Sequence, residues 1–150
     1  MVQFFQFEAD FVDSLRCIPM QVRLKLDTCG IKLKLPQWHQ LSPKERQALV
    51  ELLCTTESEI RAYRELLQRL VLERAGVAAT DLPVEANPAW IDTTTVPDSV
   101  QAAAQEIGVT ITLEQWVALT LEQRFALIKL TRSNHENENF LPALKEFHVV

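Results

Sequence analysis

Residues 18–52 read IPMQVRLKLDTCGIKLKLPQWHQLSPKERQALVEL, and residues 96–130 read VPDSVQAAAQEIGVTITLEQWVALTLEQRFALIKL. Displaced by 78 residues, the two segments carry identical residues at eleven positions. The same signals recur in both: Pro at a helix start, Gly at its end, an extended link, a tryptophan turn and a capped helix. We therefore predict two pseudo-repeated helical units that pack as a pseudo-symmetric pair around Trp38 and Trp116. The identical pairs are Pro19/Pro97, Val22/Val100, Gly30/Gly108, Leu35/Leu113, Gln37/Gln115, Trp38/Trp116, Leu41/Leu119, Arg46/Arg124, Ala48/Ala126, Leu49/Leu127 and Leu52/Leu130.

Capping boxes mark the helix that closes each copy and the helix that follows the first copy. Ser42-Pro43-Lys44-Glu45 has Ser at the N-cap, Pro at the first helical position and Glu at the third, and Thr120…Gln123 is the matching signal. Thr56-Glu57-Ser58-Glu59 opens the longest helix, which we predict over residues 57–75, ended by Gly76. Helical spacing assigns its buried face to Ile60, Tyr63, Leu67, Leu70 and Val71.

Helices are also predicted at the N-terminal side of the chain. Pro19 to Cys29 has a helical apolar period and is followed by Gly30, which favours a helix with a glycine end. Residues 7–16 carry Phe7, Phe11 and Leu15 on one face, which predicts an earlier helix.

The extended links and the connector leave alternatives open. Residues 31–35 and 109–113 alternate apolar and polar side chains, so they are either a minimal two-stranded ribbon or two extended connectors. Residues 77–96 form a long connector with two prolines and no clear period. Trp90 within it either pins the connector onto the core, which we favour, or anchors a partner protein.

A polar run, Ser133-Asn134-His135-Glu136-Asn137-Glu138-Asn139, precedes an apolar C-terminal segment. We favour an N-cap at Asn137 or Asn139 that opens a helix over about residues 140–147. The alternative is a hydrogen-bonding surface for a partner, with Arg132 beside it. The candidate partner-contact residues are therefore Trp90, Arg132, His135, Asn137 and Asn139.

Size and composition favour a mainly α, compact single domain over residues 1–150. The chain is 47% apolar and holds only 3 Gly and 7 Pro. Its net charge of −5 disfavours nucleic acid as a partner, since phosphate binding needs a basic surface.

The start of the chain and its cysteines favour a cytoplasmic, reduced location. Phe4, Phe5 and Phe7 are followed by acidic residues, which is not the pattern of a signal peptide. No apolar run approaches the ~20 residues of a membrane span. Three cysteines are too few, and odd in number, for a disulfide framework.

Metal and cofactor binding are not expected. Cys17 and Cys29 flank one predicted helix, so they would stand ~18 Å apart at ~1.5 Å per residue. A zinc ion needs each sulfur within ~2.3 Å. Cys29 falls on an apolar stripe, where a thiol behaves as a small core residue. The three histidines, His39, His135 and His148, share no ligand spacing.

Catalytic patterns are not found, which favours a binding or accessory protein over an enzyme. No serine lies in a G-x-S-x-G elbow, and each of the three glycines follows a predicted helix instead of forming a phosphate-binding loop. Arg46 and Arg124 recur at matching positions, and we expect them to cap carbonyls of the neighbouring link rather than to bind substrate.

Three stretches carry a resemblance to a known family. They are FFQFEADFVDSLRCIPMQVRLKLDTCGIKLKL near the N-terminus, NPAWID…VPDSV in the middle and RFALIKLTRSNHENENFLPALKEF near the C-terminus. Together they resemble the nitrate reductase-associated protein family of cyanobacteria, over about Phe4 to Phe147. The resemblance implies a small cytoplasmic accessory protein of assimilatory nitrate reductase. That enzyme carries a molybdenum–guanine dinucleotide cofactor and an iron–sulfur cluster and takes electrons from ferredoxin.

The resemblance implies nitrate reductase as the protein partner and identifies no catalytic or binding residue. The leading hypothesis is a non-catalytic factor that supports assembly, cofactor loading or stability of the reductase. Two alternatives are a carrier that hands a cofactor or metal to the enzyme, which would need reactive cysteines, and a permanent small subunit or electron-transfer adaptor.

Overall fold

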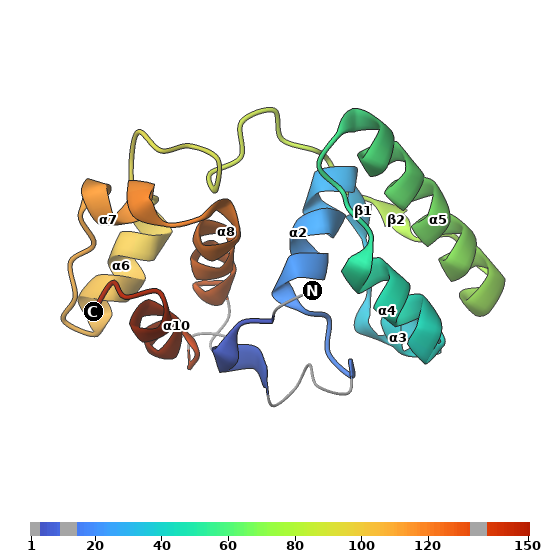
Figure 1. The fold of residues 1–150 in the computed structure, drawn as a ribbon, viewed down its shortest axis with the longest axis horizontal. Coiled ribbons are helices and arrows are strands. Elements are labelled where there is room, and N and C mark those ends of the chain that lie inside the picture. Colours follow the sequence, from blue (N-terminus) through green and yellow to red (C-terminus); the bar gives the residue numbers. More distant parts are fainter. Residues whose placement is uncertain (1–3, 10–14, 133–137) are drawn as a thin grey trace. The chain divides into compact units, whose positions relative to one another are not determined.

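The computed structural model describes residues 4–9, 15–132 and 138–150, which form mainly helical structure with one small ribbon (Figure 1). This confirms the mainly α fold class. The chain divides into two compact units, residues 1–84 and residues 85–150, hereafter unit 1 and unit 2. A single domain over residues 1–150 stays a prediction, and each unit is described by itself.

Unit 1 contains most of the helices that local signals predict. Its described elements are η1 (Gln6–Glu8), α2 (Met20–Cys29), β1 (Ile31–Lys32), α3 (Leu35–Gln40), α4 (Pro43–Glu51), α5 (Glu57–Ala75) and β2 (Thr80–Asp81). The Ser42 hydroxyl accepts from the Glu45 amide at 3.1 Å, which confirms the capping box of α4. The Thr56 box opens α5 in the same way, and Gly76 ends it with a left-handed φ of 80°.

The core of unit 1 packs the apolar sides of α2, α3, α4 and α5 together with β1. Tyr63, Leu67, Leu70 and Val71 of α5 are buried, as the helical spacing predicts, and Ile60 packs partly buried against them. Trp38 of α3 is fully buried, and its indole Nε1 donates to the carbonyl oxygen of Leu15 at 2.8 Å.

The ribbon exists, but its strands are not the two links whose pairing the sequence left open as one alternative. Ile31 pairs with Asp81 and Lys32 with Thr80, so β1 is antiparallel to a strand of the connector and not to residues 109–113. The Leu82 amide continues the ribbon by donating to the Gly30 carbonyl at 2.8 Å. The second link takes no strand assignment, because Gln101 satisfies the amide and carbonyl of Ile111 through its own side chain.

Among the residues described, the predicted helix over residues 7–16 agrees with the structure at its start and not at its end. Gln6–Glu8 form a short 3-10 helix and Ala9 is helical, whereas Leu15 has a positive φ of 55°. Residues 10–14, with Phe11, lie outside the described part. The Glu8 side chain in this segment is buried, and its carboxylate accepts from the Met20 amide at 3.1 Å. The N-cap of α2 is Pro19, which offers no side-chain acceptor, so Glu8 caps this helix from a distance in sequence.

Unit 2 contains α6 (Asp98–Glu106), α7 (Leu113–Ala118), α8 (Leu121–Leu130) and α10 (Phe140–Glu146). Thr112 and Thr120 cap α7 and α8 through their hydroxyls, and the cap at Thr120 confirms the predicted signal. Asn139 stands at the N-cap of α10, although its side chain makes no capping hydrogen bond, and Asn137 lies outside the described residues.

Helices of the two units begin at matching positions. The starts of α2 and α6, of α3 and α7, and of α4 and α8 each differ by 78 residues. The two indoles also act alike, since Trp116 Nε1 donates to the carbonyl oxygen of Asp92 at 3.2 Å. The order of the helices in the two segments is thus the same. Superposition of the two segments, and their packing as a pseudo-symmetric pair, stay predictions.

Candidate functional site

The indole of Trp90 lies in unit 2 as a packing side chain. It is 8% exposed and meets the ring of Phe125 edge-on, with centroids 5.0 Å apart and an angle of 87° between the rings. Edge-to-face contact is a favourable arrangement of two aromatic rings. This placement supports the first interpretation of Trp90, in which it pins the connector. Partner contact through Trp90 stays a prediction that its burial does not favour.

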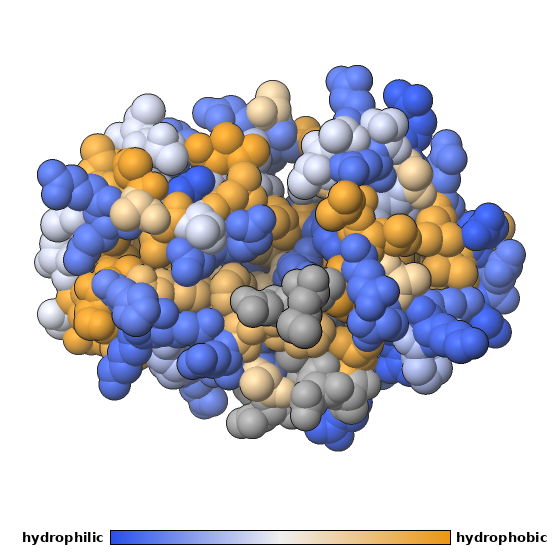
Figure 2. Space-filling model, in the orientation of Figure 1, coloured by the Kyte–Doolittle hydropathy of each residue, from blue (hydrophilic) through white to orange (hydrophobic). Residues whose placement is uncertain are grey.

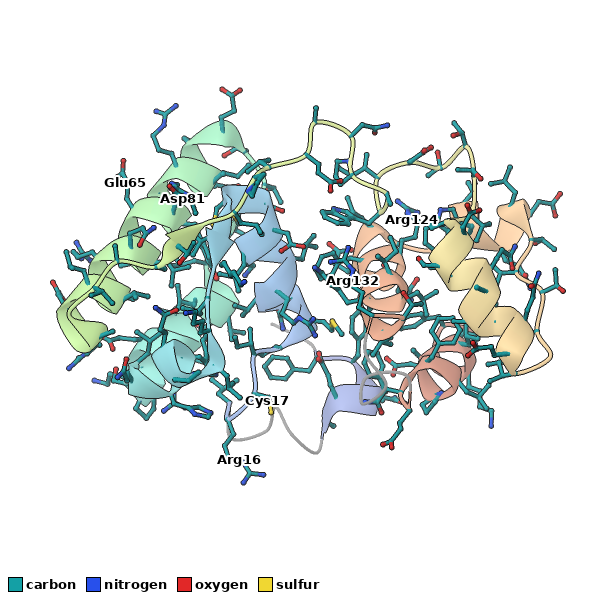
Figure 3. All side chains as sticks on the ribbon, turned by 180° about the vertical axis from the view of Figure 1, so that it is seen from behind. Arg16, Cys17, Glu65, Asp81, Arg124 and Arg132 are labelled. Atoms are coloured by element: carbon teal, nitrogen blue, oxygen red, sulfur yellow. The ribbon has the colours of Figure 1, made fainter. Side chains whose placement is uncertain are left out.

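The other candidate contact residues lie between α8 and α10 in sequence. Arg132 is exposed, directly beyond the end of α8, where its amide donates to the carbonyl oxygen of Lys129 at 3.2 Å (Figure 3). Asn139 is half-buried at the start of α10. His135 and Asn137 lie outside the described residues, so no contact can be given for them. The structure therefore provides one exposed candidate, Arg132, and one half-buried candidate, Asn139, without joining them into one site.

Arg124 is a buried cation that binds backbone carbonyls. Its side chain is part of α8 (Figure 3), the residue is 8% exposed, and Nε donates to the carbonyl oxygen of Trp90 at 2.7 Å. Nη1 donates to the carbonyl oxygen of Leu119. Arg46, its counterpart in α4, donates from Nη1 to the carbonyl oxygen of Leu15 at 3.2 Å. Both arginines therefore cap carbonyls, but of the segment that precedes each repeat copy and of Leu119, not of the links that the sequence suggested.

Replacing Arg124 by methionine should detach the connector from α8. The Trp90 carbonyl loses a charge-assisted donor, so we expect a loss of about 2 kcal/mol in the free energy of unfolding of unit 2. Amide exchange of Ile91 and Asp92, which donate to the Pro88 carbonyl, should accelerate. Arg46→Met is the matched control and should leave these two amides unchanged. Unchanged exchange in Arg124→Met would contradict the role given to this side chain.

Two of the three cysteines are buried thiols of low reactivity. Burial, reinforced by the neighbouring Cys54 thiol, raises the pKa of Cys29 to about 12. Burial also raises the pKa of Cys54 to about 11, although the Lys25 ammonium opposes this shift. The nucleophile and metal ligand is the thiolate, so these two side chains hold little of the reactive form near neutral pH. Cys17 is half-exposed (Figure 3).

Lys25 is a structural residue that the sequence gave no reason to single out. Its Nζ donates to the carbonyls of Val50 at 2.7 Å and Leu52 at 2.6 Å, at the end of α4. The Tyr63 hydroxyl donates to the carbonyl of Leu49 at 2.7 Å. A cation at a helix C-terminus satisfies carbonyls that lack an intrahelical donor. The role of Lys25 becomes visible only in the structure, where its Nζ reaches the carbonyls at the end of α4.

Arg64 is the second such residue, and it joins α5 to the ribbon. Its Nη1 donates to the carbonyls of Cys29 at 3.0 Å and Gly30 at 2.9 Å, where α2 ends. Its Nη2 forms a hydrogen bond and ion pair with the carboxylate of Asp81, which is labelled in Figure 3. These contacts hold the ribbon against the helices and leave Arg64 no obvious role toward a ligand.

Charge is unevenly divided between the two units. Residues 1–84 carry eleven acidic and eleven basic side chains, whereas residues 85–150 carry nine acidic and four basic ones. The whole net charge of −5 therefore belongs to unit 2. Figure 2 shows apolar residues at the surface among these polar ones. The large apolar side chains of unit 2 that are more than 40% exposed, among the residues described, are Ile91, Ile107, Leu113, Val117 and Val150.

No group of three or more His, Cys, Asp or Glu side chains within residues 4–9, 15–132 and 138–150 is arranged to hold a metal ion. In the same ranges, no helix has the length and apolar character needed to cross a membrane.

Comparison with protein-family models gives one match that covers nearly the entire chain. A family described as "Conserved nitrate reductase-associated protein" matches residues 4–147. No curated protein and no solved structure matched the chain. The match extends over both units and over every helix described above. The chain therefore belongs to the conserved nitrate reductase-associated protein family.

Proposed function

We propose that this protein is a non-catalytic accessory factor that binds nitrate reductase and supports its assembly, cofactor loading or stability in the cytoplasm. The observation that carries the proposal is the family match over residues 4–147, because the family is described by its association with that enzyme. The family description speaks of association with nitrate reductase. Direct binding and a role in maturation are our proposal.

The use of the reactive side chains in unit 1 and unit 2 supports a binding role. Three basic side chains donate hydrogen bonds to backbone carbonyls: Lys25, Arg64 and Arg124. The thiols of Cys29 and Cys54 are buried and have raised pKa values. Side chains used in this way stabilise the fold. A function of the protein would therefore depend on its exposed residues. A carrier that transfers metal or cofactor through thiolates would need the opposite environment around its cysteines.

The test is purification of the tagged full-length protein from cells that grow on nitrate. We expect the reductase polypeptide to co-purify, and we expect reductase from a deletion strain to contain less molybdenum and iron per polypeptide than wild-type reductase. Fully loaded but inactive reductase in the deletion strain would instead indicate electron delivery. Reductase that is unaffected by the deletion and not enriched in the purification would refute the proposal.

A Cys17→Ala, Cys29→Ala and Cys54→Ala triple variant separates the binding factor from the carrier. Restored reductase activity in the deletion strain is the expected result, because the proposal gives the thiols no transfer chemistry. Loss of complementation by a variant that folds normally, judged by circular dichroism, would favour the carrier.

A further inference from the structure

One surface of unit 2 combines exposed apolar side chains with negative charge. Leu113 and Val117 lie one turn apart on α7 and are 46% and 48% exposed. Glu114, between them in sequence, is also exposed. Gln115 Nε2 donates to the carbonyl oxygen of Val149 at 3.2 Å, which holds the C-terminal residues, with Val150 52% exposed, beside α7. We call Leu113, Glu114, Val117 and Val150 the α7 face.

The exposed charged side chains of unit 2 are mainly acidic. Exposed acidic side chains described in unit 2 are Glu85, Asp98, Glu106, Glu114, Glu122 and Glu138. Two of the four basic residues of the unit, Arg124 and Lys129, are 8% exposed, so they add little positive charge to the surface. The exposed basic residues of the described part of unit 2 are Arg132 and Lys145. The surface potential of this unit is therefore negative.

The helix arrangement of residues 96–130 does not depend on their negative charge. Residues 18–52 carry six basic and three acidic side chains, whereas residues 96–130 carry two basic and four acidic ones. The helices of the two segments nevertheless begin at matching positions. Lys44 of α4 stands where α8 has Glu122, and both are exposed. Exposed charges contribute little to stability, so the sign of the charge on unit 2 is available for recognition of a partner.

We propose that the α7 face is a docking surface for a positively charged protein segment with apolar anchor residues, and, on the basis of the proposed function, that the nitrate reductase polypeptide supplies this segment. Negative potential repels nucleic acid and anionic membranes. It also repels the same face of a second copy, since an isologous contact would bring like charges together. A positively charged protein segment with apolar residues complements both the negative charge of unit 2 and the exposed apolar side chains of the α7 face.

The test measures binding of the full-length protein to purified nitrate reductase polypeptide by titration at low and high salt. Leu113→Ser with Val117→Ser should weaken binding about tenfold or more, because exposed apolar anchors dominate such interfaces. Leu35→Ser is the matched control: Leu35 occupies the same first position of α3 and is 44% exposed. Its binding should change less than about twofold, since surface contacts outside the interface core are near-neutral.

Charge is tested by a second matched pair. Glu114→Lys with Glu122→Lys should weaken binding at low salt by about tenfold and should reduce its salt dependence, because screening acts on attraction between exposed charges. Lys44→Glu, which changes the counterpart of Glu122 in unit 1, should leave both quantities unchanged. Circular dichroism melting of each variant verifies that the exposed substitutions leave the fold intact.

The outcomes separate this inference from the proposed function. Wild-type binding that the α7 variants do not weaken, or that Leu35→Ser weakens as strongly, would overturn the docking surface and leave the accessory function in place. No binding by the wild-type protein would overturn both. Concentration-dependent self-association that Leu113→Ser with Val117→Ser abolishes would assign the face to a second copy and overturn the proposal as well.

Discussion

Replacing Gly30 by alanine is expected to lower the free energy of unfolding of unit 1 by about 3 kcal/mol. Gly30 ends α2 with a left-handed φ of 80°, which costs a residue with a Cβ atom about 1–2 kcal/mol. The added Cβ would also lie 2.8 Å from Cγ2 of Val84 and 2.9 Å from the carbonyl oxygen of Leu82. One of these neighbours is backbone that the ribbon holds in place, so the contact cannot relax without loss of a ribbon hydrogen bond.

The chain offers a matched control for this prediction. Gly108 is the counterpart of Gly30 in unit 2, with a φ of 76° and no atom within 4 Å of an added Cβ. Gly108→Ala should therefore cost only the conformational part, about 1–2 kcal/mol. Urea unfolding of both variants, with amide exchange to assign the loss to one unit, measures the difference. Equal losses in the two variants would show that the close approach at Gly30 contributes nothing.

Alkaline pH is expected to destabilise unit 1 by about 3 kcal/mol between pH 9 and pH 11. Cys29 and Cys54 have folded-state pKa values raised to about 12 and about 11 by burial. Above pH 9 the unfolded thiols lose protons that the folded thiols still hold, so stability falls as the pH rises toward the folded pKa values. Tyr63 adds to the loss, because burial raises its pKa as well.

Lys25 acts in the opposite direction and limits the effect. Burial lowers its pKa, so between the lowered pKa and its usual value the unfolded state holds more protons and stability rises with pH. The two thiols and the phenol together lower the free energy of unfolding by more than the single amine raises it. The net effect of alkaline pH is therefore a loss of stability. Urea unfolding at pH 8, 9, 10 and 11 measures it, with amide exchange reporting on unit 1.

A variant pair isolates the thiols. Cys29→Ala with Cys54→Ala should remove most of the decline above pH 9, although the double variant begins from a lower stability at pH 8 because it leaves small cavities. Cys17→Ala retains both buried thiols and should show the wild-type decline. The same slope in the double variant would mean that other groups cause the alkaline loss.

Helix positions were the part of the structure that local sequence predicted well. Ser42 and Thr56 cap α4 and α5 through hydrogen bonds that span three residues, and Gly76 ends α5 where a left-handed residue is needed. Such signals lie within a few residues of the helix end that they control, so they can be read without the rest of the chain. The contact between Glu8 and α2 is the opposite case, because the carboxylate lies twelve residues from the amide that it caps.

The candidate site was predicted only in part. The sequence identifies the nitrate reductase-associated family, and its charges can be counted for each unit. It favours a Trp90 that packs onto the core, in agreement with its burial. It does not show that Leu113 and Val117 are exposed, because helical spacing ranks the faces of a helix but does not show which one a neighbouring element covers.

By itself, then, the sequence determined where most helices begin and end, the family and the sign of the charge, since each depends on nearby residues or on simple counts. The tertiary structure alone decided that β1 pairs with residues 80–81, that Lys25 and Arg64 cap the ends of other helices, and that the α7 face is exposed. The contacts among these join residues tens of positions apart in sequence. They stabilise the protein only when tertiary packing brings the partners together, so a local pattern does not predict them.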